Sequence, residues 1–372
     1  MYERGAIELT TICWTSCKTP IIRTKLRLRP LRHRSRHPAG IKVPSPTATT
    51  DRHNDPTDIH PDRARRDRLH RLTDAATYRA LRAPRQSIRR VRGLDIHVTC
   101  WGPEPSAQRP TLVLLHGFLN TGSTFQFMVD AMRQDWSLVA PDWRGFGRSA
   151  WAASSYWFPD YLADLDALLD QFSPDSPVCL VGHSMGGNVA CLYAGVRPER
   201  VRCIVDLEGI GVRRTTPEEA PAQLRRWLDE VKTSPGAKHY ASFEQLATVI
   251  RFRYPRFTTL QADFLARCWG GLDADGHVHL LGDPRHAWAN PILYRRDESE
   301  ALWRRIEAPV LLMLGAESEF VSRLGEDGTD TAFHAAFPRL EIARVAGAGH
   351  MLHIERADLV AELTENFLHS YG

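Results

Sequence analysis

The pentapeptide GHSMG at residues 182–186 follows the apolar run VCLV at residues 178–181 and precedes the small-residue stretch GNVACLYA at residues 187–194. This order predicts a strand, a tight turn and a helix, with glycines on both sides of the serine so that strand and helix can approach closely. A serine on such a turn projects from the backbone toward any base nearby. Ser184 is therefore the candidate nucleophile.

Apolar runs alternate with helical patterns from about residue 91 to the end of the chain. Runs typical of buried strands lie at residues 111–115, 138–141, 178–181, 201–205 and 310–314, while residues 96–101 alternate as an edge strand would. Apolar residues recur at helical spacing over residues 161–172. The alternation predicts an α/β fold with a mostly parallel, doubly wound sheet, which binds ligands at the carboxyl ends of its strands.

The first part of the chain differs in charge from the rest. Residues 1–92 hold 22 Lys and Arg against 8 Asp and Glu, which leaves 26 against 36 for the remainder of a chain whose net charge is +4. Eight prolines and little apolar periodicity predict a disordered basic tail over residues 1–88. A targeting segment, a nucleic-acid-binding arm and a misplaced gene start all stay open for it. The tail lacks the interleaved aromatic residues that favour nucleic acid.

The cysteines and the hydropathy pattern indicate the compartment. Seven cysteines are an odd number, and those at 179, 191 and 203 lie in apolar segments typical of reduced, packed thiols. We expect no metal, because no Cys or His pairs have zinc-site spacing, and no other cofactor. No apolar run has the length of a signal peptide or a membrane span. The sequence therefore predicts a cytoplasmic protein that acts on a small molecule, with no membrane or nucleic-acid partner, and leaves the oligomeric state open.

A histidine near the carboxyl terminus is the candidate base. His350 lies in the loop-like segment VAGAGHM at residues 345–351, directly before a helical pattern, so its ring can reach the serine proton. His353 is the fallback, and Glu355 is expected to orient the loop. The turn HGF at residues 116–118 follows a strand, which suggests the backbone N–H groups of Phe118 and Met185 as an oxyanion hole.

Four motifs in this order resemble the α/β-hydrolase fold family over about residues 91–372: HG at 116–117, DWRGFGRS at 142–149, GHSMGG at 182–187 and AGH at 348–350. The long stretch after residue 208 resembles the cap-bearing serine hydrolases. The resemblance implies a core of residues 89–208 and 301–372, with a helical cap at 209–300 inserted after the strand that follows the nucleophile helix. It also implies Ser184 as nucleophile, His350 as base and an acid between them.

The acid departs from the family pattern. The family commonly has Gly-x-x-Asp after the strand that precedes the final crossover, but residues 315–318 read GAES and place a serine there. We predict Glu319 as the acid, because the longer glutamate side chain could recover the reach to the imidazole. The alternatives are Glu317 on the same loop and Asp206 or Glu208 after the strand that follows the nucleophile helix.

These residues predict a serine hydrolase that cleaves a carboxylic ester, or a related lactone or thioester, through an acyl-enzyme. Aromatic residues are frequent in the predicted cap and around residues 151–158, which favours a small apolar substrate. The candidate substrate-binding residues are Trp151, Trp157, Trp227 and Trp269. A serine nucleophile argues against the aspartyl-ester chemistry of some relatives. Hydrolysis of a C–C bond, acyl transfer on the same triad, and a non-catalytic binding protein with this fold remain alternatives.

Overall fold

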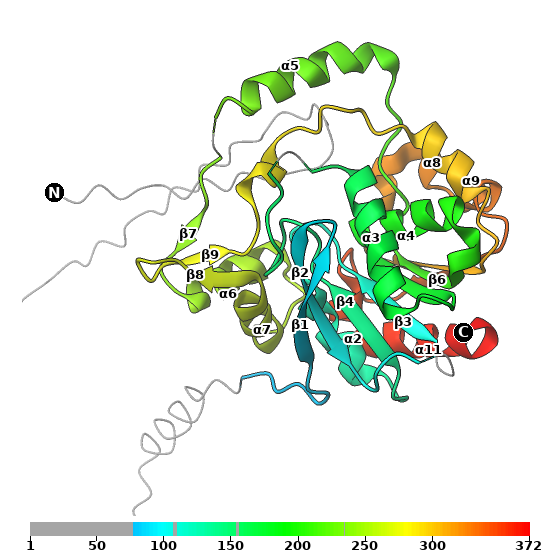
Figure 1. The fold of residues 1–372 in the computed structure, drawn as a ribbon, viewed down its shortest axis with the longest axis horizontal. Helices are drawn as coiled ribbons and strands as arrows, with labels where there is room; N and C mark the ends of the chain where they lie inside the picture. Colours follow the sequence, from blue (N-terminus) through cyan, green and yellow to red (C-terminus); the bar gives the residue numbers. More distant parts are fainter. Residues whose placement is uncertain (1–76, 107–109, 154–155, 234) are drawn as a thin grey trace, which may run out of the picture. The chain divides into compact units, whose positions relative to one another are not determined.

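The computed structural model describes residues 77–106, 110–153, 156–233 and 235–372; residues 1–76, which hold most of the predicted tail, lie outside it. Within these ranges eight strands form one sheet in the order β1-β2-β4-β3-β5-β6-β10-β11 (Figure 1). The strands are β1 (Arg85–Val91), β2 (Leu94–Trp101), β3 (Thr111–Leu115), β4 (Ser137–Pro141), β5 (Val178–His183), β6 (Val201–Leu207), β10 (Val310–Gly315) and β11 (Leu340–Val345). The β1–β2 and β2–β4 pairs are antiparallel, and the remaining pairs are parallel. The predicted mostly parallel sheet is confirmed.

Helices cover both faces of this sheet, as the continuous apolar runs require. Along β3, Leu112 and Leu114 pack into one buried cluster, with α2 (Gln126–Ala131) and α11 (Ala357–Tyr371). The alternate residues Val113 and Leu115 pack into another, with α3 (Phe158–Phe172) and α4 (Met185–Val196). Successive side chains of a strand point to opposite faces, so a run that is buried on both faces must be apolar throughout.

The globular body begins earlier than the sequence predicts. β1 starts at Arg85 and pairs along its whole length with β2, so β1 rather than β2 is the edge strand. Before it, the Tyr78 hydroxyl donates a hydrogen bond of 2.6 Å to the Asp130 carboxylate. The predicted tail boundary at residue 88 is therefore too late, because a polar antiparallel edge strand lacks the apolar run that marks a buried one.

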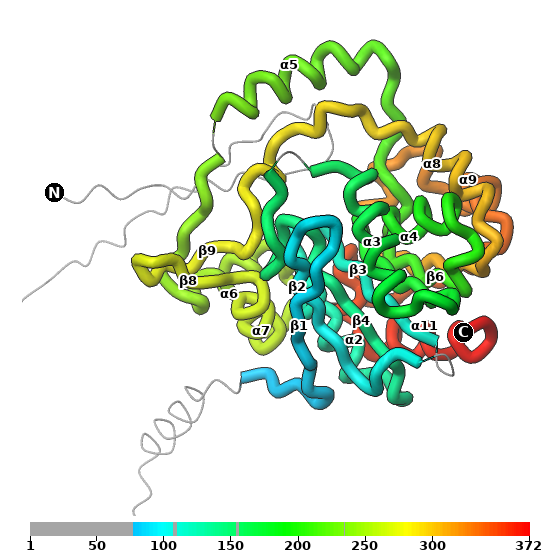
Figure 2. The backbone as a smooth tube through the Cα atoms, in the orientation of Figure 1, coloured from blue at the N-terminus to red at the C-terminus, as the bar shows by residue number. Residues whose placement is uncertain are grey.

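The segment between β6 and α8 (Arg296–Trp303) contains helices and a small sheet, whereas the sequence predicts helices alone. Its helices include α5 (Ala220–Glu230), α6 (Phe243–Arg253) and α7 (Thr259–Trp269), and its described strands β7 (His239–Tyr240), β9 (Val278–Leu280) and β8 (Gly270–Leu272) pair in that order. Figure 2 shows the chain rising to α5 and returning above the sheet to α8. Strands of two or three residues are too short for an alternation signal.

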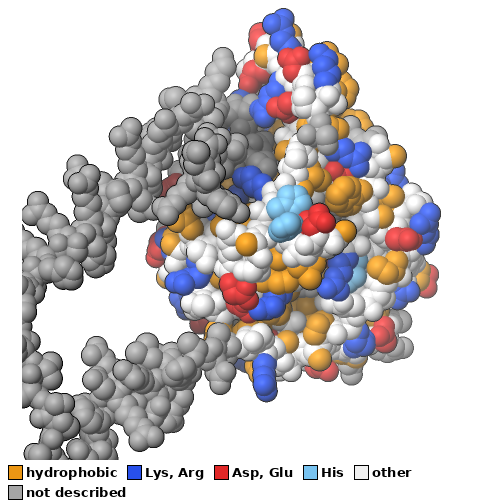
Figure 3. Space-filling model, turned by 90° about the vertical axis from the view of Figure 1, so that its left-hand side faces the viewer, with side chains coloured by type: hydrophobic (Ala, Val, Ile, Leu, Met, Phe, Trp, Pro, Cys, Tyr) orange, Lys and Arg blue, Asp and Glu red, His pale blue; other side chains and the backbone are white. Residues whose placement is uncertain are grey.

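The two halves of this segment differ in how they pack. α6 and α7 share a buried apolar cluster with Phe127 of α2 and Met351, and the Trp269 indole donates a 3.0 Å hydrogen bond to the Thr124 hydroxyl. α5 has no buried residue and exposes Leu224 and Leu228. In Figure 3 the projecting part at the top carries hydrophobic side chains along one edge. Only the α5 half stands clear of the core.

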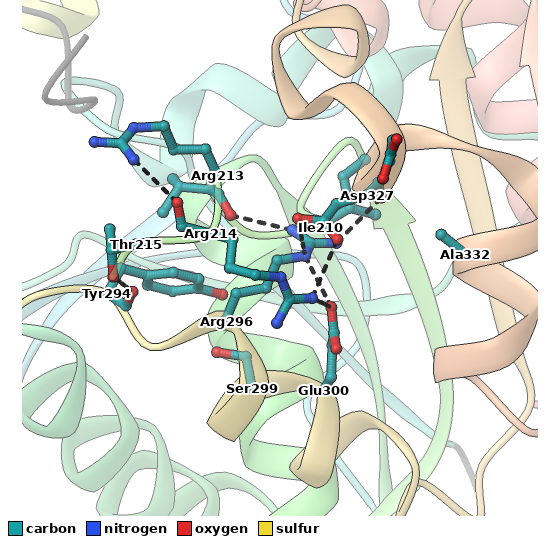
Figure 4. Close-up of polar contacts among 12 residues, drawn as sticks. Ile210, Arg213, Arg214, Thr215, Tyr294, Arg296, Ser299, Glu300, Asp327 and Ala332 are labelled. Atoms are coloured by element: carbon teal, nitrogen blue, oxygen red, sulfur yellow. Dashed lines mark hydrogen bonds and ion pairs between the residues drawn. The ribbon is translucent and has the colours of Figure 1, made fainter. Parts of the chain in front are cut away.

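A buried arginine fixes both ends of the inserted segment. Arg296, at the start of α8, has a side chain 2% exposed, and its guanidinium donates to the carbonyl oxygens of Ile210 and Val212, each at 3.1 Å. It also pairs with Glu300 at 3.0 Å and Asp327 at 3.4 Å (Figure 4). Asp327 lies in the 3-10 segment η5 (Val321–Gly328) after β10. One side chain thus joins the segment that follows β6, the start of α8 and the loop after β10.

We expect Arg296→Met to lower the free energy of unfolding by about 3 kcal/mol or more, because it breaks a buried charge network and leaves the Ile210 and Val212 carbonyls without their donor. Arg214 is the matched control: it pairs with the same two carboxylates at 2.7 and 3.1 Å, but its side chain is 46% exposed. Arg214→Met should cost less than about 1 kcal/mol. Urea unfolding followed by circular dichroism measures both, and equal losses would contradict the role given to Arg296.

Candidate active site

Ser184 sits in a strained turn between β5 and α4. Its backbone angles are φ 52° and ψ −114°, a left-handed region that non-glycine residues rarely occupy. The Ser184 N–H donates to the Leu207 carbonyl at 2.9 Å, which fixes the turn against β6. A Cβ added at Gly186 would lie 2.0 Å from the Leu115 carbonyl oxygen, so only glycine lets α4 approach β3 this closely. The predicted strand, turn and helix around the serine are all present.

The structure brings Ser184, His350 and Glu208 together in one line of hydrogen bonds. The Ser184 hydroxyl lies 3.1 Å from His350 Nε2. His350 Nδ1 lies 2.7 Å from Glu208 Oε2. A carboxylate only accepts, so Nδ1 carries the proton and Nε2 is left to accept from the serine. This is the tautomer and spacing that a nucleophile, base and acid require.

Glu208 is held by the ends of β6 and β10. It directly follows β6, its side chain has no exposed surface, and its φ is 57°. The Gly315 N–H donates to Oε1 at 2.7 Å, and the Ser318 hydroxyl donates to Oε2 at 2.7 Å. Together with His350 Nδ1, three donors fix a carboxylate that burial would otherwise destabilise.

The predicted acid Glu319 is not the residue that reaches His350. Its side chain is 87% exposed, with Arg323 at 3.8 Å. The Glu317 carboxylate pairs with Arg256 of the inserted segment at 2.7 Å, and the Glu317 side chain is about half-exposed. The chain turns outward after β10, so both carboxylates face solvent. The correction from Glu319 to Glu208 follows from the sheet order, which places the end of β6 beside the end of β10.

Asp206, another alternative, lies fully buried in β6 and has other partners. Its oxygens accept from the Gly209 N–H at 2.5 Å and from the Cys191 thiol at 3.5 Å. Burial raises the pKa of Asp206 to about 7, against the lowering effect of these two bonds. Its hydrogen bond to Gly209 shapes the turn that presents Glu208.

Two further histidines lie buried behind His350. The His183 Nε2–H donates to the His350 carbonyl at 2.9 Å, and burial holds the pKa of His183 well below its ordinary value. His353, the fallback base, packs against His183 and Phe125 in tilted arrangements, with ring centroids 4.3 and 5.1 Å away. Burial lowers the pKa of His353 to about 3. Both rings are therefore neutral at pH 7, and His183 anchors the backbone of the candidate base.

The loop that carries His350 is fixed on both sides. The Gly349 N–H donates to Glu355 Oε2 at 2.6 Å, so the predicted loop-orienting role of Glu355 is confirmed. The Phe320 ring stacks on the imidazole at 4.5 Å between centroids. No local motif marks Phe320, Ser318 or His183 as site residues, because each acts through a contact between distant parts of the chain.

The two predicted oxyanion donors follow residues that adjoin or form the nucleophile turn. Met185 is the first residue of α4, so its N–H has no acceptor within the helix. The turn before Phe118 passes over the serine: a Cβ built on Gly117 would lie 3.2 Å from the Ser184 Cβ. His116 stabilises this turn, because Nδ1–H donates to the Gly117 carbonyl at 2.8 Å and Nε2 accepts from the Trp143 N–H at 2.9 Å.

The four candidate substrate-binding tryptophans separate into two groups. Trp269 is 5% exposed and belongs to the apolar cluster between the inserted segment and the core, which corrects its assignment to the substrate. Trp151 and Trp157 are 50% and 39% exposed, and Trp227 lies half-buried on α5. These three remain candidates for apolar contacts.

One cluster of possible metal ligands lies outside this site. Asp273, Asp275 and His277, on the exposed turn between β8 and β9, each offer an atom within 4.8 Å of the others. Asp273 Oδ1 already accepts the N–H groups of Asp275 at 2.9 Å and His277 at 2.8 Å, which explains the cluster as a turn. No helix in the described part of the chain combines the length and apolar character needed to cross a bilayer.

Residues 110–357 match the family model of the α/β-hydrolase fold. The chain belongs to this family. It is 26% identical over 276 residues to a serine hydrolase-like protein of Danio rerio, which covers 72% of this chain and 83% of the relative. It is 29% identical over 240 residues to the 3-hydroxybutyrate-oligomer hydrolase of Cupriavidus necator, covering 60% and 77%.

Among solved structures, the thioesterase domain of a curacin biosynthetic pathway superposes with a TM-score of 0.65 at 25% identity, covering 76% of this chain and 99% of that domain. The family match and the relatives, which are named hydrolases and a thioesterase, show that this protein is a hydrolase. They leave open which class of bond it cleaves.

The buried histidines predict acid sensitivity. In the unfolded chain His353 has its ordinary pKa of 6.5, whereas burial lowers its pKa in the folded chain to about 3. The unfolded chain therefore binds a proton more readily, and the free energy of unfolding falls as pH drops below 6.5. In His353→Phe, the loss of unfolding free energy between pH 7 and pH 5 should be smaller by about 2 kcal/mol. Urea unfolding at both pH values measures it. Replacement of the exposed His334 is the control, and an unchanged slope in His353→Phe would contradict the assignment.

Proposed function

We propose that this α/β-hydrolase is a serine esterase that cleaves a carboxylic ester, lactone or thioester of a small apolar substrate through an acyl-enzyme. The observation that carries the proposal is the unbroken line from the Ser184 hydroxyl through His350 to Glu208, at 3.1 and 2.7 Å. A buried carboxylate, an imidazole in the required tautomer and a serine on a strained turn have few joint uses other than nucleophilic catalysis.

Acylation begins at the serine. His350 Nε2 takes the Ser184 proton, the resulting oxygen nucleophile attacks the substrate carbonyl, and Glu208 stabilises the imidazolium that forms. The N–H groups of Phe118 and Met185 hold the negative charge of the tetrahedral intermediate. The C–O or C–S bond to the leaving group then breaks, and the leaving group takes the proton from His350.

Deacylation repeats these steps with water. His350 removes a proton from water, the hydroxide attacks the acyl carbonyl, and collapse of the intermediate returns the proton to Ser184 Oγ and releases the acid. His183 and His353, neutral because of burial, add no positive charge next to the imidazolium. No step calls for a metal or an organic cofactor.

Exposed apolar side chains support an apolar substrate. Trp151 and Trp157 lie on the segment between β4 and α3, while Leu224 and Leu228 lie on α5. Contact of these side chains with an apolar acyl or alcohol group is the interpretation that we favour. The names of the relatives, an oligomer hydrolase and a thioesterase domain, place oligoesters and thioesters in the test panel.

The test combines labelling with turnover. The folded chain should react with a fluorophosphonate probe, and Ser184→Ala should abolish the labelling. A panel of p-nitrophenyl esters, lactones, acyl thioesters, anilides and a β-diketone should give the highest kcat/KM on an ester or thioester. Labelling with turnover of the β-diketone alone would favour C–C hydrolysis, and labelling with acyl transfer to an added alcohol would favour a transferase. No labelling of the folded chain would leave a non-catalytic binding protein.

The acid can be tested directly. Glu208→Gln keeps the size of the side chain but removes its charge, so kcat on a p-nitrophenyl ester should fall by about 10³- to 10⁴-fold. Glu319→Gln is the matched control and should change kcat by less than about two-fold, because its side chain faces solvent. Thermal unfolding should show that both variants fold. A large loss in Glu319→Gln together with a small one in Glu208→Gln would reverse the assignment.

A further inference from the structure

The Ser318 hydroxyl occupies an unusual place beside the candidate acid. Its Oγ donates to Glu208 Oε2 at 2.7 Å, the same oxygen that lies 2.7 Å from His350 Nδ1. The hydroxyl also accepts the Phe320 N–H at 3.2 Å. Its single proton is therefore committed to the carboxylate, because the Phe320 N–H approaches from the accepting side.

Each of these contacts bears on the geometry of the base. Glu208 extends from the end of β6, and without a second donor on Oε2 the carboxylate could turn about its last side-chain bond, a torsion with broad minima. The Gly315 N–H at 2.7 Å holds Oε1, and Ser318 holds Oε2. Phe320, whose N–H holds the Ser318 hydroxyl, also stacks on the imidazole at 4.5 Å. The segment 318–320 therefore positions both the acid and the base.

We infer that Ser318 is a positioning residue that fixes Glu208 Oε2 on the His350 Nδ1–H, and that the side chain of residue 318 is close enough to supply the acid itself. The inference rests on the proposed function. An aspartate at 318 would carry its carboxylate carbon near the present Oγ and its oxygens one bond beyond. That places an acceptor in the region now filled by Oε2, provided that the side chain at 208 is shortened so that it no longer fills this region.

The kinetic test uses a set of five variants and p-nitrophenyl butyrate. Ser318→Ala should lower kcat by about 10- to 100-fold, as expected for loss of a hydrogen bond to a charged group, with KM within two-fold of the parent. Ser318→Thr keeps the hydroxyl and should recover most of the loss. Glu208→Ala with Ser318→Asp should be at least about ten-fold faster than Glu208→Ala alone. Ser322→Ala, a neighbouring hydroxyl that donates to the Glu319 carbonyl at 2.8 Å, is the control.

A readout that needs no turnover separates this inference from the proposed function. The Nδ1–H of His350, bonded to a buried carboxylate, should give a low-field proton resonance that disappears in His350→Gln. Ser318→Ala should shift or broaden that resonance, and Ser318→Thr should restore it. If the wild-type chain neither reacts with the fluorophosphonate nor turns over any substrate, the proposed function is wrong. The resonance still shows whether Ser318 positions Glu208 on His350. An unchanged resonance in Ser318→Ala, unchanged kcat in that variant, or no gain in the double variant would each overturn the inference.

Discussion

The shared edge at the carboxyl ends of β5, β6, β10 and β11 is the constraint on which the site depends. These four strands are neighbours in the sheet and run parallel, so the residues that follow them meet at one edge. Ser184 follows β5, Glu208 follows β6, Ser318 lies shortly after β10, and His350 lies after β11. Four side chains that are far apart in the sequence thus form one hydrogen-bonded line without any long loop to carry them.

Two of these residues hold backbone angles that cost free energy, and the sheet edge stabilises both. Ser184 and Glu208 have φ values of 52° and 57°. A non-glycine residue in this region costs of order 1–3 kcal/mol, and it persists only where the surroundings fix it. The Ser184 N–H bonds to the Leu207 carbonyl at 2.9 Å, and the Glu208 N–H bonds to the Met313 carbonyl at 3.1 Å. Each strained residue is therefore held by the neighbouring strand, which makes the nucleophile and the acid parts of one rigid unit.

The same constraint explains what the sequence could predict and what it could not. The run TLVLL at residues 111–115 became β3 without a change of boundary, because burial on both faces demands an unbroken apolar stretch. Ser184 and His350 could be found because local motifs mark them. The prediction of Glu319 was wrong because it rested on closeness in sequence to the position where the family commonly has its acid. The carboxylate that reaches His350 comes instead from the end of the neighbouring strand β6. The register that pairs Leu207 with Met313 depends on packing between distant segments, and no local motif records it.

Because Glu208 lies directly before the inserted segment, the first residues of that segment must be held in place. The acid is separated from Ile210, on the first leg of that segment, by a single residue, so any movement of the leg would be transmitted to the triad. The Gly209 N–H is bound by Asp206, and the Ile210 and Val212 carbonyls are bound by the buried Arg296 (Figure 4). Beyond these anchors α5 has no buried residue, and its hydrogen bonds to the returning leg, such as Gln223 Nε2 to the Asn290 carbonyl at 2.7 Å, lie within the inserted segment. The position of Glu208 therefore depends on the Asp206 and Arg296 contacts, which hold the residues directly after it, and not on α5.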